Sequence, residues 1–226
     1  MQVVILAAGE GKRMRPLTAT TPKPLLTIAG RTLLDHIFEA LPQEVTEAVI
    51  VVKYLGDQIK AYCGESFHGR AIHYADGSDL GTAYSFLAAQ PYVTEDRFLF
   101  LYGDEFPDLE DIKACLRHPV SILCWEADDP WNHGVATVRP DGTIQKIIEK
   151  PKVPASSLIV GGVMVLNKKI FTYKPEKKLN GEFFFTNMLN QFVHETPVVA
   201  ITSKQKIGGI STPADIERVE ELLTHR

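Results

Sequence analysis

The sequence predicts an α/β protein in which a mainly parallel sheet is flanked by helices. In the first half, short and fully apolar runs alternate with segments of helical periodicity, a pattern typical of parallel strands buried on both faces. In the second half, strand-like runs follow one another with short connections, which indicates a strand-rich lobe on the same sheet. The expected strands are 3–6, 48–52, 72–74, 98–102, 121–126, 134–138, 144–149 and 158–166, and the expected helices are 33–41, 57–62, 82–90 and 213–223.

Local signals define where several of these elements begin and end. Thr32 and Asp35 have the spacing of a capping box at the start of the first helix. Pro91 closes the helix that begins at residue 82, and Pro140–Gly142 is a turn signal between two strands. Thr212 is the expected N-cap of the last helix and Pro213 its first residue.

Composition narrows the class of protein. With 226 residues, a net charge of −4 and 45% hydrophobic residues, we expect one domain over 1–226, with halves of about 1–120 and about 121–226. Three widely spaced cysteines argue against a disulfide scaffold and favour a reducing compartment, so we expect a cytoplasmic protein. No apolar run reaches the ~18 residues of a membrane span. The net charge is mildly negative, so the composition shows none of the excess of basic residues that is typical of nucleic-acid-binding proteins.

The segment from Ala7 to Pro24 carries the densest chemistry. It follows a buried strand and contains Gly9 and Gly11, which allow close approach of a ligand to the backbone amides. Arg13 and Lys23 add two cations suited to phosphates. The segment lacks the Ser or Thr of a P-loop after Gly11-Lys12, so it indicates a different anion site. A bare Gly-x-Gly also fits a tight turn, and Arg13 and Lys23 also fit a solvated surface.

The whole segment, Leu6-Ala-Ala-Gly-Glu-Gly-Lys-Arg-Met-Arg-Pro-Leu-Thr followed by Pro22-Lys-Pro, resembles the signature of sugar-1-phosphate nucleotidylyltransferases (NDP-sugar pyrophosphorylases, in the nucleotidyltransferase family). Four further segments resemble that family in the same order: Asp79–Ala83, Tyr102–Asp104, Ile148–Pro151 and Gly181–Asn187. The resemblance implies a Rossmann-like fold with a small sugar-binding lobe. It also implies the transfer of a nucleotidyl group from an NTP to a sugar 1-phosphate, with release of pyrophosphate.

Residue by residue, the resemblance implies three roles. Arg13, Lys23 and Asp104 would be catalytic, and Asp104 would bind Mg²⁺. The implied nucleotide-binding residues are Leu6, Ala7, Ala8, Gly9, Gly11, Lys12, Arg13, Lys23, Asp76, Gly81 and Thr82. The implied sugar-phosphate residues are Tyr102, Gly134, Glu149, Lys150, Gly162 and Glu182. The partners would be small molecules, and the protein itself a monomer or homodimer.

The sequence departs from the family at two places. The C-terminal Trp-x-Asp-Ile-Gly-Thr-Pro appears as Ile207–Pro213, so Gly209 stands where a second metal-binding aspartate is expected. Either Asp104 binds the metal with phosphates and water, or a neighbour such as Glu105 contributes, or activity is impaired. The family's Asn-Ala-Gly appears as Val160-Gly161-Gly162, which removes one expected sugar contact.

The position that reads the base in this family is Asp76 here, five residues before Gly81. A carboxylate can accept two hydrogen bonds from guanine or one from the amino group of cytosine. Uracil and thymine offer one N–H donor beside a carbonyl oxygen, which the carboxylate would repel. We therefore expect the protein to prefer GTP, followed by CTP and then by UTP or dTTP. Asp76 also fits the alternative of a simple turn residue before Gly77.

Two other functions remain open. Ala83-Tyr84-Ser85-Phe86 has aromatic rings that suit a quaternary ammonium, which fits a cytidylyltransferase acting on phosphocholine. Loss of the aspartate at Gly209 fits a nucleotide-binding pseudoenzyme. We expect no C-terminal β-helix domain, and the expected pathway is nucleotide-sugar supply for a surface polysaccharide.

Overall fold

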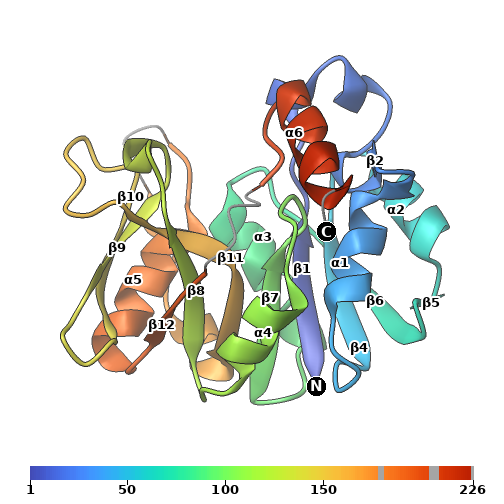
Figure 1. Cartoon of the computed structure of the whole chain (residues 1–226). Helices are drawn as coiled ribbons and strands as arrows, with labels where there is room; N and C mark the ends of the chain where they lie inside the picture. Colours follow the sequence, from blue (N-terminus) through green and yellow to red (C-terminus); the bar gives the residue numbers. More distant parts are fainter. Residues whose placement is uncertain (178–180, 204–208, 225–226) are drawn as a thin grey trace.

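The computed structural model describes residues 1–177, 181–203 and 209–224 (Figure 1). Its centre is a ten-stranded sheet with the main order β10-β9-β11-β7-β1-β4-β6-β5. The first half supplies parallel neighbours: β1 (Gln2–Ala7), β4 (Glu47–Val52), β6 (Arg70–Asp76) and β7 (Arg97–Tyr102). The predicted α/β fold, mixed and mainly parallel, is confirmed.

The second half extends the same sheet, as predicted. β11 (Leu158–Asn167) runs antiparallel to β7 and therefore joins the two halves. β8 (Ser121–Glu126) also pairs with β11, and β9 (Gly134–Val138) and β10 (Ile144–Glu149) form the hairpin expected at 140–142. β12 (Val199–Thr202) adds a parallel partner to β8. Strands from both halves therefore meet beside the carboxyl end of β7.

The helices cover both faces of the sheet. On one face, α3 (Thr82–Leu87) and α5 (Phe185–Glu195) bury a cluster that contains Phe86, Phe100 and Phe192. On the other face lie α1 (Leu33–Ala40), α2 (Gly56–Cys63), α4 (Leu109–Leu116) and α6 (Pro213–Thr224), whose cluster contains Ile37, Ile59 and Ile112. This coverage explains the continuous apolar strands. Within the described part of the chain, no helix has the length and apolar character needed to cross a membrane.

Several boundaries differ from the sequence prediction. The helix expected at 82–90 ends at Leu87 and gives way to a 3₁₀ turn at Gln90–Tyr92, because Pro91 lacks a backbone N–H. The segment 7–24 contains 3₁₀ turns at Lys12–Met14, Leu17–Ala19 and Lys23–Leu25. Further 3₁₀ turns occupy Pro130–Asn132 and Lys168–Thr172, and short strands occupy β2 (Thr27–Ile28), β3 (Arg31–Thr32) and β5 (Ser66–Phe67). The sequence prediction missed all three short strands, α4, α5 and β12.

The two helix caps turn out differently. The capping box between Thr32 and Asp35 is confirmed, with both reciprocal hydrogen bonds present. The last helix begins at Pro213 as predicted, but the carboxylate of Asp215 accepts hydrogen bonds from the Ser211 and Thr212 amides and from the Thr212 hydroxyl. At this helix, the predicted role of the Thr212 side chain as acceptor is therefore replaced by that of Asp215.

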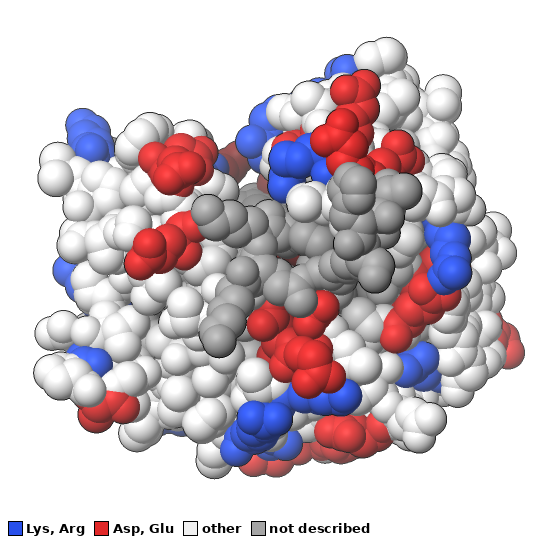
Figure 2. Space-filling view, viewed as in Figure 1, with Lys and Arg blue, Asp and Glu red and all other residues white. Residues whose placement is uncertain are grey.

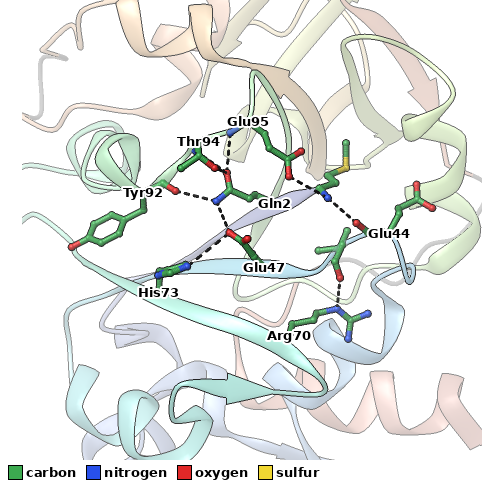
Figure 3. Close-up of polar contacts among 10 residues, drawn as sticks. Gln2, Glu44, Glu47, Arg70, His73, Tyr92, Thr94 and Glu95 are labelled. Carbon is green, nitrogen blue, oxygen red and sulfur yellow. Dashed lines mark hydrogen bonds and ion pairs between the residues drawn. The ribbon is translucent and has the colours of Figure 1, made fainter.

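The amino end of β1 is fixed by the buried Gln2 side chain (Figure 3). Its amide nitrogen donates to Glu47 of β4 at 2.9 Å and to the Tyr92 carbonyl at 3.1 Å. Its amide oxygen accepts from the backbone amides of Thr94 and Glu95 at 2.8 and 3.1 Å. This network joins β1 to β4 and to the turn before β7 at the edge opposite the candidate site, and thereby sets the relative position of the three central strands.

Candidate active site

The segment Gly9–Arg13, called the glycine loop below, follows the carboxyl end of β1 and leaves open space around its backbone at Gly9. Gly9 is exposed, and a Cβ placed on it would meet no atom within 4 Å. Gly11 has a φ of +60°, a left-handed conformation that glycine adopts without strain. Leu6 and Ala7 are buried within β1, and Ala8 packs against the backbone at Gly77. At Gly9 the loop therefore exposes its backbone to solvent, and no side chain covers it.

Lys23 and Asp104 meet beside this loop. The Lys23 ammonium lies 2.7 Å from Asp104 Oδ2, although 81 residues separate them in the sequence. The Lys23 side chain is 9% exposed and that of Asp104 is 47% exposed. Because Asp104 follows β7 and β7 pairs with β1, sheet order brings the two groups together. The ion pair neutralises a buried ammonium and leaves one side of the carboxylate accessible.

The other cations of the loop are more exposed. The Arg13 guanidinium donates to the Ser211 hydroxyl at 3.2 Å, and Lys12 lies 3.4 Å from Glu10. Ser211 precedes α6, so the C-terminal segment contacts the predicted phosphate-binding arginine. In Figure 2, Lys and Arg side chains line one wall of a notch between the lobe that carries α5 and the part that carries α6.

The second predicted nucleotide loop is joined to the segment before α5. Gly81 has a φ of +126°, and a Cβ there would lie 2.5 Å from the Phe183 carbonyl oxygen. The Phe183 amide donates to Leu80 O, and the Phe185 amide donates to the Thr82 hydroxyl at 2.9 Å. Glycine at 81 is therefore required by the protein's own packing. These bonds bring two predicted motifs into direct contact on the same face of the sheet.

Asp76 stands apart from those contacts. It ends β6, its side chain is 90% exposed, and its carboxylate lies 3.4 Å from the Lys60 ammonium. The structure therefore places the predicted base-reading carboxylate at the rim of the second loop, facing solvent and within reach of a cation from α2.

The sugar-phosphate residues gather on the other side of β7. Glu149 ends β10, its side chain is 11% exposed, and it accepts a hydrogen bond from the Thr186 hydroxyl at 2.7 Å. A Cβ on Gly134 would lie 3.0 Å from Thr186 Cγ2 and 3.4 Å from Glu149 Oε2, so glycine keeps this corner open. Lys150 has a φ of +44°, and its ammonium lies 5.4 Å above the Phe184 ring. Glu182 is exposed.

Glu105, next to Asp104 in the chain, has a buried carboxyl group. Its carboxylate accepts a hydrogen bond from the Gly162 amide at 2.8 Å. Burial, and then the neighbouring Asp104, raise the pKa of Glu105 to about 8. Burial also raises the pKa of Tyr102 well above its ordinary value, with further contributions from Glu149, Glu105 and Asp104. The charges of these three carboxylates therefore disfavour ionisation of the Tyr102 hydroxyl.

One departure from the family pattern, at Gly161, has a packing reason. A Cβ on Gly161 would lie 2.1 Å from the Trp125 ring, so the expected alanine has no room here. Glu105 forms an isolated bridge with Gly209, whose own Cβ would lie 3.3 Å from Glu105 Cγ. Ile207 and Gly208, the preceding part of that motif, lie outside the described residues. Sequence reasoning did not single out Ser211 or Thr186, because their contacts join distant parts of the chain.

Comparison with known proteins identifies the family. The nucleotidyl transferase family model matches residues 2–211, and the chain belongs to that family. It is 32% identical over 225 residues to a protein named bifunctional protein GlmU from Methanocaldococcus jannaschii, covering 99% of this chain and 54% of that relative. It is 32% identical over 182 residues to a protein named UTP--glucose-1-phosphate uridylyltransferase AglF from Haloferax volcanii, covering 76% of this chain and 74% of that one. The chain thus spans about half the length of the GlmU relatives it matches.

Solved structures share the fold. A UDP-glucose pyrophosphorylase complexed with UDP-glucose superposes with a TM-score of 0.84 at 17% identity, covering 99% of this chain and 98% of that one. An inositol-1-phosphate CTP transferase from T. maritima gives a TM-score of 0.79 at 24% identity, covering 99% and 94%. The family model thus confirms the predicted family, and these structures confirm the Rossmann-like fold.

Proposed function

We propose that the protein transfers a nucleotidyl group from an NTP to a sugar 1-phosphate. An oxygen of the sugar phosphate forms a bond to the α-phosphorus, the bond from that phosphorus to the bridging oxygen breaks, and pyrophosphate leaves with the electron pair. The attacking phosphate is already ionised near neutral pH, so no general base is required. The observation that carries this proposal is the ion pair between Lys23 and Asp104 at 2.7 Å, between the glycine loop and the end of β7.

The described side chains divide this work by position. The loop amides and Arg13 would bind the β- and γ-phosphates, and Lys23 would neutralise charge near the α-phosphate. Lys150, on the opposite side of β7, would bind the incoming sugar phosphate, while Glu149 and Glu182 would accept hydrogen bonds from sugar hydroxyls. We thus propose one domain with two halves. The half of about 1–120 would bind the nucleotide, and the half of about 121–226 would bind the sugar phosphate.

Asp104 is the residue we propose for Mg²⁺ binding. Its carboxylate is half exposed, whereas Gly209 offers no side-chain ligand and Glu105 already accepts from the Gly162 amide. Among the described residues, no group of three or more His, Cys, Asp or Glu side chains has metal-binding geometry. This donor set fits Mg²⁺, which often keeps several waters and takes one or two carboxylates together with substrate phosphates. When bound, the ion would neutralise charge on those phosphates.

We propose GTP as the favoured nucleotide, followed by CTP and then UTP or dTTP. The support is Asp76, whose carboxylate faces solvent at the rim of the second loop and accepts hydrogen bonds only. The same proposal includes a cytoplasmic location, a monomer or homodimer, and a role in supplying nucleotide sugar for a polysaccharide.

The test measures pyrophosphate release. GTP, CTP, UTP and dTTP would each be combined with the 1-phosphates of mannose, glucose, heptose and N-acetylglucosamine in the presence of Mg²⁺. We expect turnover with at least one pair, and loss of at least 100-fold in Lys23→Met, because the buried cation is removed beside the reacting phosphates. Lys113→Met, which breaks an exposed ion pair on α4, is the matched control. Absence of pyrophosphate with every pair would contradict the proposal.

A cytidylyltransferase that acts on phosphocholine is the second candidate. Tyr84 supports it, since its ring lies beside the second loop, edge-to-face with Phe183 at 5.0 Å. Turnover of CTP with phosphocholine, and with no sugar phosphate, would favour this reading. NTP binding without turnover, together with gain of activity in Gly209→Asp, would instead indicate a pseudoenzyme.

A further inference from the structure

Residues 18–20, which lie between the glycine loop (Gly9–Arg13) and Lys23, are bound by the segment that follows β4. The Tyr54 hydroxyl lies 2.9 Å from the Thr18 carbonyl oxygen and 3.2 Å from that of Ala19. The Gln58 side-chain amide donates to the Thr20 carbonyl at 2.9 Å. The three consecutive carbonyls of residues 18–20 therefore accept hydrogen bonds from Tyr54, which precedes α2, and from Gln58 in its first turn.

Thr18 carries this contact inward to the glycine turn. It is fully buried, and its hydroxyl donates to the Gly11 carbonyl at 2.8 Å. The same carbonyl accepts from the Met14 amide at 2.8 Å, which closes the turn that contains Arg13. Two successive hydrogen bonds thus connect Tyr54 to the turn that we propose for phosphate binding.

The packing at Gly11 gives Thr18 a second role. A Cβ at Gly11 would lie 3.0 Å from Thr18 Cγ2 and 3.4 Å from Lys23 Cβ. The α-carbon of Gly11 is therefore packed between the Thr18 methyl group and the stem of Lys23. Because the turn and Lys23 approach each other this closely, a shift of Thr18 would change the spacing between the loop amides and the Lys23 ammonium.

The backbone of Leu55, directly after Tyr54, has a strained conformation. Leu55 has a φ of +51° and a ψ of +32°, a left-handed conformation that is unfavourable for a side chain with a Cβ. Such conformations persist where the surrounding structure over-determines them, and they cluster at functional sites. Here the turn at Leu55 redirects the chain from β4 into α2 directly after Tyr54.

We propose that Thr18 and Tyr54 are positioning residues for the nucleotide phosphates. Neither is proposed to touch the substrate. Tyr54 fixes the Thr18 backbone, and Thr18 fixes the glycine turn relative to Lys23, so that the phosphate-binding groups are spaced before the nucleotide arrives. This inference rests on the proposed function, in that the loop from Gly9 to Arg13 is taken to bind nucleotide phosphates.

The test compares nucleotide affinity in matched variants. The Kd of GTP, CTP, UTP and dTTP would be measured by titration calorimetry with Mg²⁺, and thermal unfolding would be recorded in parallel. Thr18→Val and Tyr54→Phe each remove one hydroxyl, and we expect each to raise the Kd of the preferred nucleotide about five- to tenfold. Thr18→Ser keeps the hydroxyl and should bind within about threefold of the unmodified protein. The double variant should lose less than the product of the single losses, because both hydroxyls act through Thr18.

Tyr74→Phe is the structural control. The Tyr74 hydroxyl donates to the Gly64 carbonyl at 2.6 Å, a similar tyrosine–carbonyl bond at the far end of α2. It should lower thermal stability comparably to Tyr54→Phe and leave the Kd within about twofold. Equal Kd values for Tyr54→Phe and Tyr74→Phe, or an unchanged Kd in Thr18→Val, would overturn the positioning role. If the unmodified protein binds nucleotide but releases no pyrophosphate, the proposed function fails while this test stands; if it binds no nucleotide, both fail.

Discussion

We expect the replacement of Gly9 by alanine to weaken nucleotide binding and to leave the stability of the fold unchanged. Gly9 is exposed, its φ lies outside the left-handed range, and a Cβ there would meet no atom within 4 Å. The folded protein therefore accommodates the methyl group without strain. We expect the free energy of unfolding to stay within about 0.5 kcal/mol or to rise slightly, because alanine restricts the unfolded chain.

Nucleotide affinity should respond differently to the same change. The methyl group would stand where the phosphates approach the loop amides, and one lost hydrogen bond to a charged group costs about 1.5–3 kcal/mol. We therefore expect the Kd of the preferred nucleotide to rise about ten- to one hundredfold in calorimetric titrations with Mg²⁺.

The control for this experiment is Gly64→Ala, which should show the opposite pattern. Gly64 has a φ of +59° and open space around its α-carbon, at the end of α2. Because Gly64 also has a ψ of −151°, a conformation essentially restricted to glycine, alanine there should cost about 1–3 kcal/mol of stability and leave the Kd unchanged. Unchanged affinity in a stable Gly9→Ala variant would refute the assignment of phosphate binding to this loop.

Three further outcomes follow from packing and charge. Gly81→Ala places a Cβ 2.5 Å from the Phe183 carbonyl oxygen at a φ of +126°, so chemical denaturation should show a loss of at least about 3 kcal/mol. Gln2→Leu removes a buried amide that bonds to Glu47, Thr94 and Glu95, whose polar groups water can reach, and should cost about 1–3 kcal/mol with an unchanged nucleotide Kd. The fold raises the Glu105 pKa from 4.5 to about 8, so the folded state binds more protons between those pH values. In EDTA, stability should therefore fall as pH rises from about 4.5 to 8, by at most about 5 kcal/mol, and Glu105→Gln should remove this slope, whereas an unaltered slope would contradict the origin assigned to it.

The elements predicted from the sequence are those whose signals are local. Continuous apolar runs such as 98–102 predicted the central strands, and the spacing of Thr32 and Asp35 predicted a cap that the structure confirms. α5 was missed although Phe185, Met188, Leu189 and Phe192 have helical spacing, because its first residues had been interpreted as part of a substrate motif. β12 has four residues and therefore too little pattern to distinguish it from a connection.

At the candidate site, the sequence predicted which groups matter more fully than how they are arranged. It selected Lys23 and Asp104, and the structure pairs them. It did not predict that Glu105 would accept from Gly162, or that Arg13 would reach Ser211, because 57 and 198 residues separate these pairs in the chain. The roles of all these residues in binding and catalysis stay predictions.

The sequence alone determined the central strands, the family and the chemical groups available, since these depend on periodicity and on residues close together in the chain. Tertiary structure decided which groups meet. The order β11-β7-β1-β4 brings the glycine loop, Asp104 and the Gly162 region to one edge of the sheet. Burial there raises the Glu105 pKa to about 8, a value set by desolvation and by a neighbouring carboxylate rather than by residue type.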